Sequence, residues 1–151
     1  KKLENNFMLF YTGRKRNSSI PAGKIIENIK IKTKYLSEMQ KMPALAKNIL
    51  LSNNFDDYEF GNLLDYAWQS KKELSNSVSN KFIDDIYSSA INAGAIGGKL
   101  LGAGSAGFML FYVPKNKQKK VLSILHKLTF VPFKFEFEGS KIVINQPKGF
   151  I

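Results

Sequence analysis

The amino-acid sequence predicts one α+β domain in which helices cover one face of a mostly antiparallel sheet. Three observations lead to this fold class. Apolar runs typical of strands occur at residues 6–12 and 108–113, a long stretch with helical periodicity separates them, and phenylalanines alternate with charged residues at 133–137. The 151 residues, of which 44% are hydrophobic and 23% charged, suffice for one hydrophobic core and match the composition of folded domains.

The N-terminal part predicts a strand followed by helices. Residues 6–12 contain an unbroken apolar run, which suits a strand buried on both faces. A first helix is expected after an N-cap at Ser18 or Ser19, with Pro21 tolerated in its first turn. Pro43 is expected to begin a second helix for the same reason.

Two further helices carry start and stop signals. Asp56 and Glu59 have the spacing of a capping box, and the helix that they begin carries Trp68 among its apolar residues. Ser79 is expected to cap the next helix, and Gly94 is well placed to end it.

The C-terminal part predicts three more strands and one helix. The apolar run at 108–113 is a strand, and Pro114 is expected to open a helix. The alternation over 133–137 predicts a half-buried strand, because successive side chains of a strand point to opposite faces. Residues 139–140 are Gly-Ser, which predicts a two-residue hairpin turn into a return strand over 142–144.

A glycine-rich segment precedes the strand at 108–113. Residues 94–107 hold six of the eleven glycines, and each glycine costs backbone entropy on folding. Gly102, Gly104 and Gly107 fit G-x-G-x-x-G, but they follow a helix and precede a strand, the reverse of the dinucleotide-binding order. We expect this loop to face an anion or a nucleotide phosphate through its backbone amides, the alternative being a tight turn. Valine at Gly104 is then expected to reduce turnover more than stability.

The charge balance suggests a phosphate-bearing partner. The chain has 23 Lys and Arg against 12 Asp and Glu, a net charge of +11, which suits nucleic acid, acidic lipid or a phosphorylated metabolite. Because the lysines are scattered, a well-solvated surface is the alternative interpretation.

The chain has no Cys and a single His, His126, so disulfides, thiolate metal sites and multi-histidine metal sites are excluded. Its apolar runs fall far short of the roughly 20 residues of a membrane-spanning helix.

Residues 94–108, GAIGGKLLGAGSAGF, resemble the third signature motif of the GHMP kinases. The remaining chain resembles one branch, the sugar kinases that act on D-glycero-D-manno-heptose 7-phosphate, over about residues 7–144. The matching segments are Phe10-Tyr11-Thr12-Gly13 with Arg16 and Ser18 after it, Leu63-Leu64-Asp65-Tyr66-Ala67-Trp68 with Lys71 and Lys72 after it, Tyr112-Val113-Pro114, and Val131-Pro132-Phe133-Lys134-Phe135 leading to Glu138-Gly139-Ser140. Ser105 and Ala106 depart from the family loop, which usually has glycine there, and the Ser105 hydroxyl is a candidate contact for a phosphate oxygen.

The resemblance implies a ferredoxin-like fold with a mostly antiparallel four-stranded sheet over residues 1–151. It implies that this chain is the C-terminal domain of a longer sugar kinase, truncated or proteolysed, and inactive alone. The N-terminal half, with the loop that wraps the ATP phosphates and the usual catalytic carboxylate, is expected to be missing. No catalytic or metal-binding residue is therefore expected in this chain, and ATP and Mg²⁺ are expected to bind mainly to the missing half.

The resemblance also implies the reaction and the site. ATP-dependent transfer of a phosphoryl group to the anomeric hydroxyl of the heptose 7-phosphate is the expected activity, in the cytoplasm. The expected ligand-facing loop is Gly102, Ala103, Gly104, Ser105, Ala106 and Gly107, and the basic candidates for the substrate phosphate are Arg16, Lys71, Lys72 and Lys99. Arg16 is favoured because a guanidinium binds phosphate through two hydrogen bonds, whereas each lysine has a solvated surface charge as its alternative. Neighbouring helix positions point about 100° apart, so only one of Lys71 and Lys72 is expected to face the substrate.

The expected partners are the sugar phosphate, ATP and the missing N-terminal domain, without nucleic acid or membrane, and a homodimer is left open. Two other functions also stay open. One is a regulatory small-molecule-binding domain of the same architecture without catalytic activity. The other is a nucleic-acid-binding module, which the charge and the aromatic content favour but which lacks a recognition motif.

Overall fold

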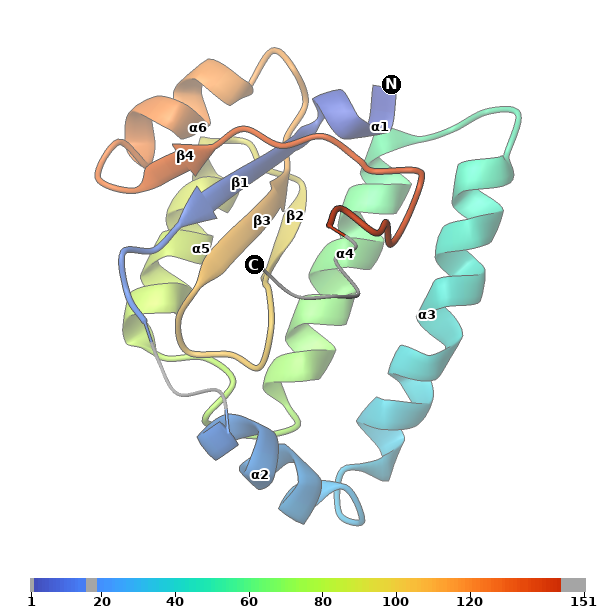
Figure 1. The fold of residues 1–151 in the computed structure, drawn as a ribbon, viewed down its shortest axis with the longest axis vertical. Coiled ribbons are helices and arrows are strands. Elements are labelled where there is room, and N and C mark those ends of the chain that lie inside the picture. The colour runs from blue at the N-terminus through green and yellow to red at the C-terminus, as the bar shows by residue number, and fades with distance from the viewer. Residues whose placement is uncertain (1, 16–18, 145–151) are drawn as a thin grey trace, which may run out of the picture.

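The computed structural model describes residues 2–15 and 19–144. Within them, four strands form one antiparallel sheet in the order β2-β3-β1-β4 (Figure 1). The strands are β1 (Phe7–Tyr11), β2 (Gly97–Leu100), β3 (Phe108–Tyr112) and β4 (Thr129–Val131). The prediction of an α+β fold with a four-stranded antiparallel sheet is confirmed.

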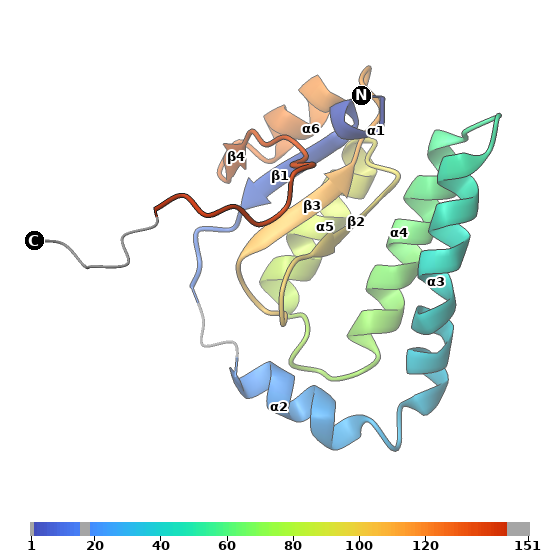
Figure 2. The ribbon, with the colours of Figure 1, turned by 45° about the vertical axis from the view of Figure 1, so that its right-hand side comes forward.

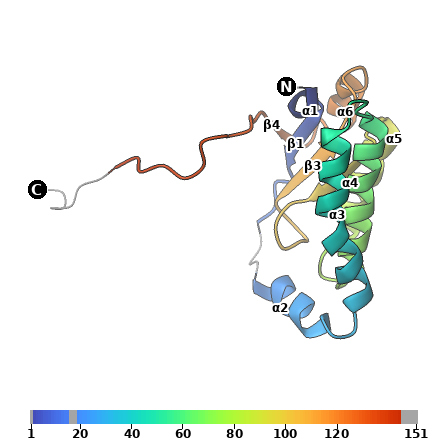
Figure 3. The same ribbon diagram turned by 90° about the vertical axis from the view of Figure 1, so that its right-hand side faces the viewer.

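The described residues also form six helices. They are α1 (Lys2–Asn5), α2 (Ser19–Asn28), α3 (Thr33–Leu51), α4 (Asp57–Lys72), α5 (Lys81–Ala93) and α6 (Gln118–Ile124). Figure 2 shows α5 behind the sheet, α4 alongside β2 and α3 on the outer side of α4. Figure 3 shows α3, α4 and α5 together on the same side of the strands. None of the helices in the described part of the chain combines the length and the apolar character that a membrane span requires.

The hydrophobic core lies between α5 and the sheet. Alternate residues of the central strands, Met8 and Phe10 on β1 and Met109 and Phe111 on β3, are buried there with Ile83 of α5. The intervening residues of β1 are only half-buried, so the strand is fully covered on one face and not on both as expected. This leaves part of the second face of the sheet open to solvent.

Most helix boundaries follow the predicted signals. The Asp56 side chain caps α4 by accepting a hydrogen bond of 2.8 Å from the Tyr58 N–H. Gly94 ends α5 with a φ of 114°, a conformation that glycine adopts without steric cost. α5 is capped by Asn80, whose side chain accepts from the Ile83 N–H at 3.1 Å, and not by Ser79 as expected.

Two prolines mark differences from the predicted helices. Pro43 lies inside α3 and does not begin a helix. Met42 and Ile49 on either side of it are buried against the rest of the domain, so packing holds the helix together despite the missing backbone N–H. Pro114 lies in a turn, where its carbonyl accepts from the Lys117 N–H at 2.8 Å, and α6 begins after it. Pro21 lies in the first turn of α2, as predicted, while the proposed cap Ser18 is outside the described residues.

The largest differences concern strands. β2 was not predicted, because residues 97–100 belong to the glycine-rich segment and were assigned to a loop. The strand expected at 133–137 and the hairpin at 139–140 are wrong, because no strand is found in the described residues after Val131. The Phe135 ring packs against Phe7 of β1 with centroids 6.1 Å apart, and the chain after it leads away from the sheet (Figure 3) without pairing with another described strand. Phe137 is 88% exposed as a result.

Candidate ligand site at the glycine loop

The β2–β3 hairpin ends in the glycine loop, which we define as residues 102–107. The Leu101 N–H donates to the Phe108 carbonyl at 2.8 Å and closes the hairpin at the base of this loop. Gly102, Gly104 and Gly107 have φ values of 77°, 121° and 115°, so the loop turns on residues in conformations that side chains disfavour. The loop therefore connects two strands, whereas the sequence suggested a connection from a helix to a strand.

Ser105 holds the loop against the segment before α5. Its φ of 59° is positive although it is not a glycine, and its hydroxyl donates to the Ser77 carbonyl at 2.5 Å. Its N–H donates to the Val78 carbonyl at 2.8 Å, and the Asn80 side-chain amide donates to its carbonyl at 2.8 Å. These bonds stabilise the strained residue. The Ser105 hydroxyl proton is thus already donated within the protein, which corrects the expectation that this hydroxyl contacts a phosphate oxygen.

Gly104 and Gly107 are also held by the surrounding structure. The Thr12 hydroxyl and the Thr12 N–H both donate to the Gly107 carbonyl, each at 2.9 Å. Gly104 is buried, and a Cβ on it would overlap the Val78 carbonyl and lie 2.7 Å from the Val78 Cα. Glycine is required at 104 because the backbone of another segment lies against it, and this requirement is independent of any ligand.

The beginning of the loop is different, because it is open. Gly102 is exposed, and a Cβ on it would meet no atom within 4 Å. The N–H groups of Gly102 and Ala103 donate to no acceptor among residues 2–15 and 19–144. Two adjacent unpaired N–H groups are suited to an anion or to hydroxyl oxygens. This part of the loop is where a ligand can approach the backbone.

Two of the predicted lysines lie together beside this open part. Lys71, in the last turn of α4, donates a hydrogen bond from its ammonium group to the Gly102 carbonyl. Burial and the positive charge of Lys99 lower the pKa of Lys71 below its ordinary value. Neither lysine forms an ion pair with any described residue. A phosphate bound here would relieve the repulsion between the two ammonium groups.

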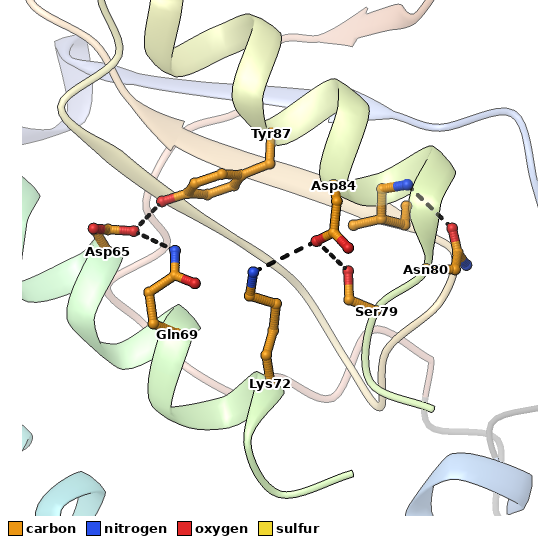
Figure 4. Close-up of polar contacts among 8 residues, drawn as sticks. Asp65, Gln69, Lys72, Ser79, Asn80, Asp84 and Tyr87 are labelled. Carbon is orange, nitrogen blue, oxygen red and sulfur yellow. Dashed lines mark hydrogen bonds and ion pairs between the residues drawn. The ribbon is translucent and has the colours of Figure 1, made fainter. Parts of the chain in front are cut away.

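Lys72 and Arg16 do not join this pair. The Lys72 ammonium lies 3.5 Å from the Asp84 carboxylate, which also accepts a hydrogen bond of 2.9 Å from the Ser79 hydroxyl (Figure 4). Lys72 therefore links α4 to α5, while its neighbour Lys71 contacts the glycine loop. Arg16 lies outside the described residues.

A partly buried polar contact near Lys72 was not predicted. Asp65 accepts hydrogen bonds from the Tyr87 hydroxyl and, at 2.8 Å, from the Gln69 side chain (Figure 4). Burial and the Asp65 carboxylate raise the pKa of Tyr87, so that its hydroxyl stays protonated. The contact of Asp65 with Gln69 could have been predicted, because the two residues are four positions apart on one helix. The contact with Tyr87 could not, because Tyr87 is on another helix and nothing in the nearby sequence indicates that the two residues meet. This contact fastens α4 to α5.

A second tyrosine shows the same pattern at the first residue of α4. The Tyr112 hydroxyl donates to Asp57 at 2.5 Å, and the Asn6 side chain donates to the same carboxylate at 2.9 Å. Burial and the Asp57 carboxylate raise the pKa of Tyr112. The two tyrosine contacts join the first turn of α4 to β3 and the middle of α4 to α5, and so position the helix that carries Lys71.

Two hollows flank the lysine pair and the glycine loop. One of about 260 Å³ is lined mainly by apolar residues of α3 and α4, with Lys99 at its edge. The other, of about 640 Å³, is lined by Tyr11, Arg14, Lys15, Leu101, Gly102, Ala103, Ala106, Gly107 and Phe108. Sequence reasoning named the loop residues and missed Tyr11, Arg14, Lys15 and Phe108, because the strands bring them beside the loop only in the folded chain.

Several known proteins are similar to this chain in sequence, in fold or in both. The family model described as GHMP kinases C terminal matches residues 42–130. The D-glycero-alpha-D-manno-heptose 7-phosphate kinase of Campylobacter jejuni is 34% identical over 145 residues, which cover 92% of this chain and 42% of that protein. The bifunctional fucokinase/GDP-fucose pyrophosphorylase of Arabidopsis thaliana is 27% identical over 124 residues, covering 80% of this chain and 12% of that protein.

A solved structure supports the fold assignment. The mevalonate kinase of Methanococcus jannaschii superposes with a TM-score of 0.69 at 23% identity, covering 86% of this chain and 39% of that one. The chain thus spans less than half the length of each of these relatives. The family model, by contrast, covers more than half of the 151 residues and includes the glycine loop. The resemblance seen in the sequence is confirmed, and this chain belongs to the C-terminal domain family of the GHMP kinases.

Proposed function

We propose that this chain is the C-terminal half of an ATP-dependent sugar-phosphate kinase. The proposed reaction transfers the γ-phosphoryl group of ATP to the anomeric hydroxyl of D-glycero-D-manno-heptose 7-phosphate. One observation carries the proposal: Lys71 and Lys99 lie together, without an acidic partner in the described chain, beside the open N–H groups of Gly102 and Ala103. The Campylobacter jejuni relative, whose name specifies this substrate, supports it.

The site has the properties that a phosphorylated substrate requires. Phosphoryl transfer depends mainly on positioning and on neutralising negative charge. Two ammonium groups can hold the phosphate that the sugar already carries, far from the reacting hydroxyl, and the two backbone N–H groups beside them can donate to oxygen atoms of the sugar. The glycine loop is fixed by Thr12 and by Ser105, so these groups are in place before the substrate binds.

The nucleotide is assigned mainly to the other half of the protein. Within residues 2–15 and 19–144, no three His, Asp or Glu side chains gather as the ligands of a metal ion would. By the family resemblance, Mg²⁺ and the group that accepts the proton are both assigned to the other half, and no residue of this chain is assigned to either. The role proposed for this half is to bind and orient the acceptor sugar phosphate.

Lysine substitutions in the full-length protein test this role. Lys71→Ala and Lys99→Ala are each expected to lower kcat/KM for the heptose 7-phosphate by about 10- to 100-fold, because each removes a charge-assisted contact. The loss should shrink with the unphosphorylated heptose, which has no distal phosphate to bind. Steady-state kinetics with both sugars measure the difference.

Lys72→Ala is the matched control for these variants. It removes a lysine from the same helical turn, but the ammonium group of this lysine faces Asp84 and not the glycine loop. We expect it to affect both sugars equally and weakly. Arg16→Ala belongs in the same series, since a guanidinium can bind phosphate through two hydrogen bonds. Equal losses on both sugars for Lys71→Ala and Lys99→Ala would show that these lysines do not bind the distal phosphate.

A further inference from the structure

An aromatic pair lies on the sheet beside the glycine loop. Tyr11 of β1 and Phe108 of β3 are directly opposite each other in the antiparallel pairing, with ring centroids 5.1 Å apart and ring planes tilted by 41°. Their neighbours along the strands, Phe10 and Met109, point into the core. The two rings therefore lie on the opposite, second face of the sheet, where Phe108 is 39% exposed. The paired rings thus form one aromatic surface on this face.

The pair forms one wall of the hollow of about 640 Å³. The opposite wall is backbone of the glycine loop, including the unpaired N–H groups of Gly102 and Ala103. Lys99 lies on the same face of the sheet, because it pairs with Leu110, two residues from Phe108 on β3. Diagonal neighbours of this kind are about 7–8 Å apart, within reach of a lysine side chain. The hollow thus adjoins the proposed phosphate site.

The positive charge around the hollow of about 640 Å³ favours an anionic ligand. Arg14 and Lys15 line it, and none of the lining residues is acidic. The Arg14 guanidinium carbon lies 3.7 Å from the centroid of the Phe82 ring, so this cation is held near the rim by an aromatic contact. A ligand that fits must combine a ring with apolar faces, oxygen atoms for the loop N–H groups and a negative charge.

We propose that Tyr11 and Phe108 form the platform on which the sugar ring of the phosphorylated substrate lies. The C–H groups of the ring pack against the aromatic faces, its hydroxyl oxygens accept from the Gly102 and Ala103 N–H groups, and its phosphate points to Lys99 and Lys71. The tilt between the two rings makes one bent surface, which fits a puckered sugar better than a flat nucleobase. This proposal rests on the proposed function and adds the residues that select the sugar.

The test is a comparison of two Michaelis constants in the full-length protein. Tyr11→Leu and Phe108→Leu remove aromatic faces but keep apolar bulk on the strands. Each should raise KM for the heptose 7-phosphate by about 3- to 10-fold, the range of measured aromatic contacts, and leave KM for ATP unchanged. Tyr11→Phe and Phe108→Tyr keep the faces and should retain the KM of the unmodified protein.

Phe130→Leu is the matched control. Phe130 is 41% exposed, like Phe108, but it contacts Phe10 and so lies on the core face of the sheet at β4. It should change neither constant. A rise in KM for ATP in the Tyr11 and Phe108 variants would assign the hollow to the nucleotide and overturn the proposal, as would unchanged constants for both substrates. Absence of sugar-phosphate transfer in the unmodified protein is a different result, because it refutes the proposed function itself.

Discussion

Replacing Trp68 by alanine is expected to lower the free energy of unfolding by about 3–5 kcal/mol, the range for truncating a buried aromatic side chain. Trp68 has no exposed surface and belongs to the core cluster between α4, α5 and the sheet. Its ring centroid is 6.4 Å from that of Tyr87, which Asp65 holds in place. Because these neighbours are fixed, the cavity cannot collapse. The midpoint of thermal unfolding should fall by on the order of 10 °C.

Two further variants show that burial is the cause. Tyr66→Ala, two residues away on the same helix, removes a ring that is 49% exposed and should change stability by no more than about 0.5 kcal/mol. Trp68→Phe should cost less than Trp68→Ala, because it fills most of the space and removes an indole N–H that has no partner among the described residues. An unchanged melting temperature for Trp68→Ala would mean that its side chain is exposed.

Gly104→Val is expected to destabilise the domain by about 2–5 kcal/mol, the sum of a disfavoured backbone conformation and an overpacked contact. The φ of Gly104 is 121°, and any Cβ there would overlap the Val78 carbonyl. The structure thus replaces the expectation from sequence that turnover would suffer more than stability. Urea unfolding of the variant measures the loss.

Gly102 and Gly104 provide a matched pair of alanine variants. Both have a positive φ, but only at Gly102 would a Cβ meet open space. Gly102→Ala should therefore cost about 1–2 kcal/mol, the penalty for the backbone conformation alone. Gly104→Ala should cost more, because the Val78 backbone must move. Equal losses in the two variants would contradict the packing reason given for Gly104.

The sequence predicted the elements whose signals are local. Helix α5 has an apolar stripe and ends at Gly94, and α4 begins at the cap of Asp56, as expected. β2 gave no such signal, because Gly97 and Gly98 have no side chains to alternate. Its glycines are required by contacts far away in sequence: a Cβ at Gly97 would overlap the Gly61 carbonyl of α4.

After β4, by contrast, a strand was predicted that is not found in the described residues. Alternating phenylalanines at 133–137 are typical of a strand, but a strand is stable only when another strand pairs with it. Periodicity reports which face of a segment is apolar and says nothing about whether a neighbour is present. No described strand pairs with these residues, so Phe135 packs against Phe7 of β1 through its ring alone and the chain beyond it leads away from the sheet.

The candidate site was predictable in part. The glycine-rich composition located the loop, and helix geometry predicted that only one of Lys71 and Lys72 would face it. Choosing Lys71 required the structure, since the choice depends on where α5 places Asp84. Tyr11 and Phe108 could not be found from sequence, because their pairing depends on the register of β1 with β3.

The central claim is that this chain is the acceptor-binding half of a sugar-phosphate kinase. Phosphorus NMR of the full-length protein with ATP and D-glycero-D-manno-heptose 7-phosphate tests it most directly. We expect ADP and a heptose bisphosphate whose new phosphorus signal couples to the anomeric proton, and no product from this chain alone. Failure of the full-length protein to form a sugar bisphosphate, a new phosphate on another hydroxyl, or turnover by this chain alone would contradict it.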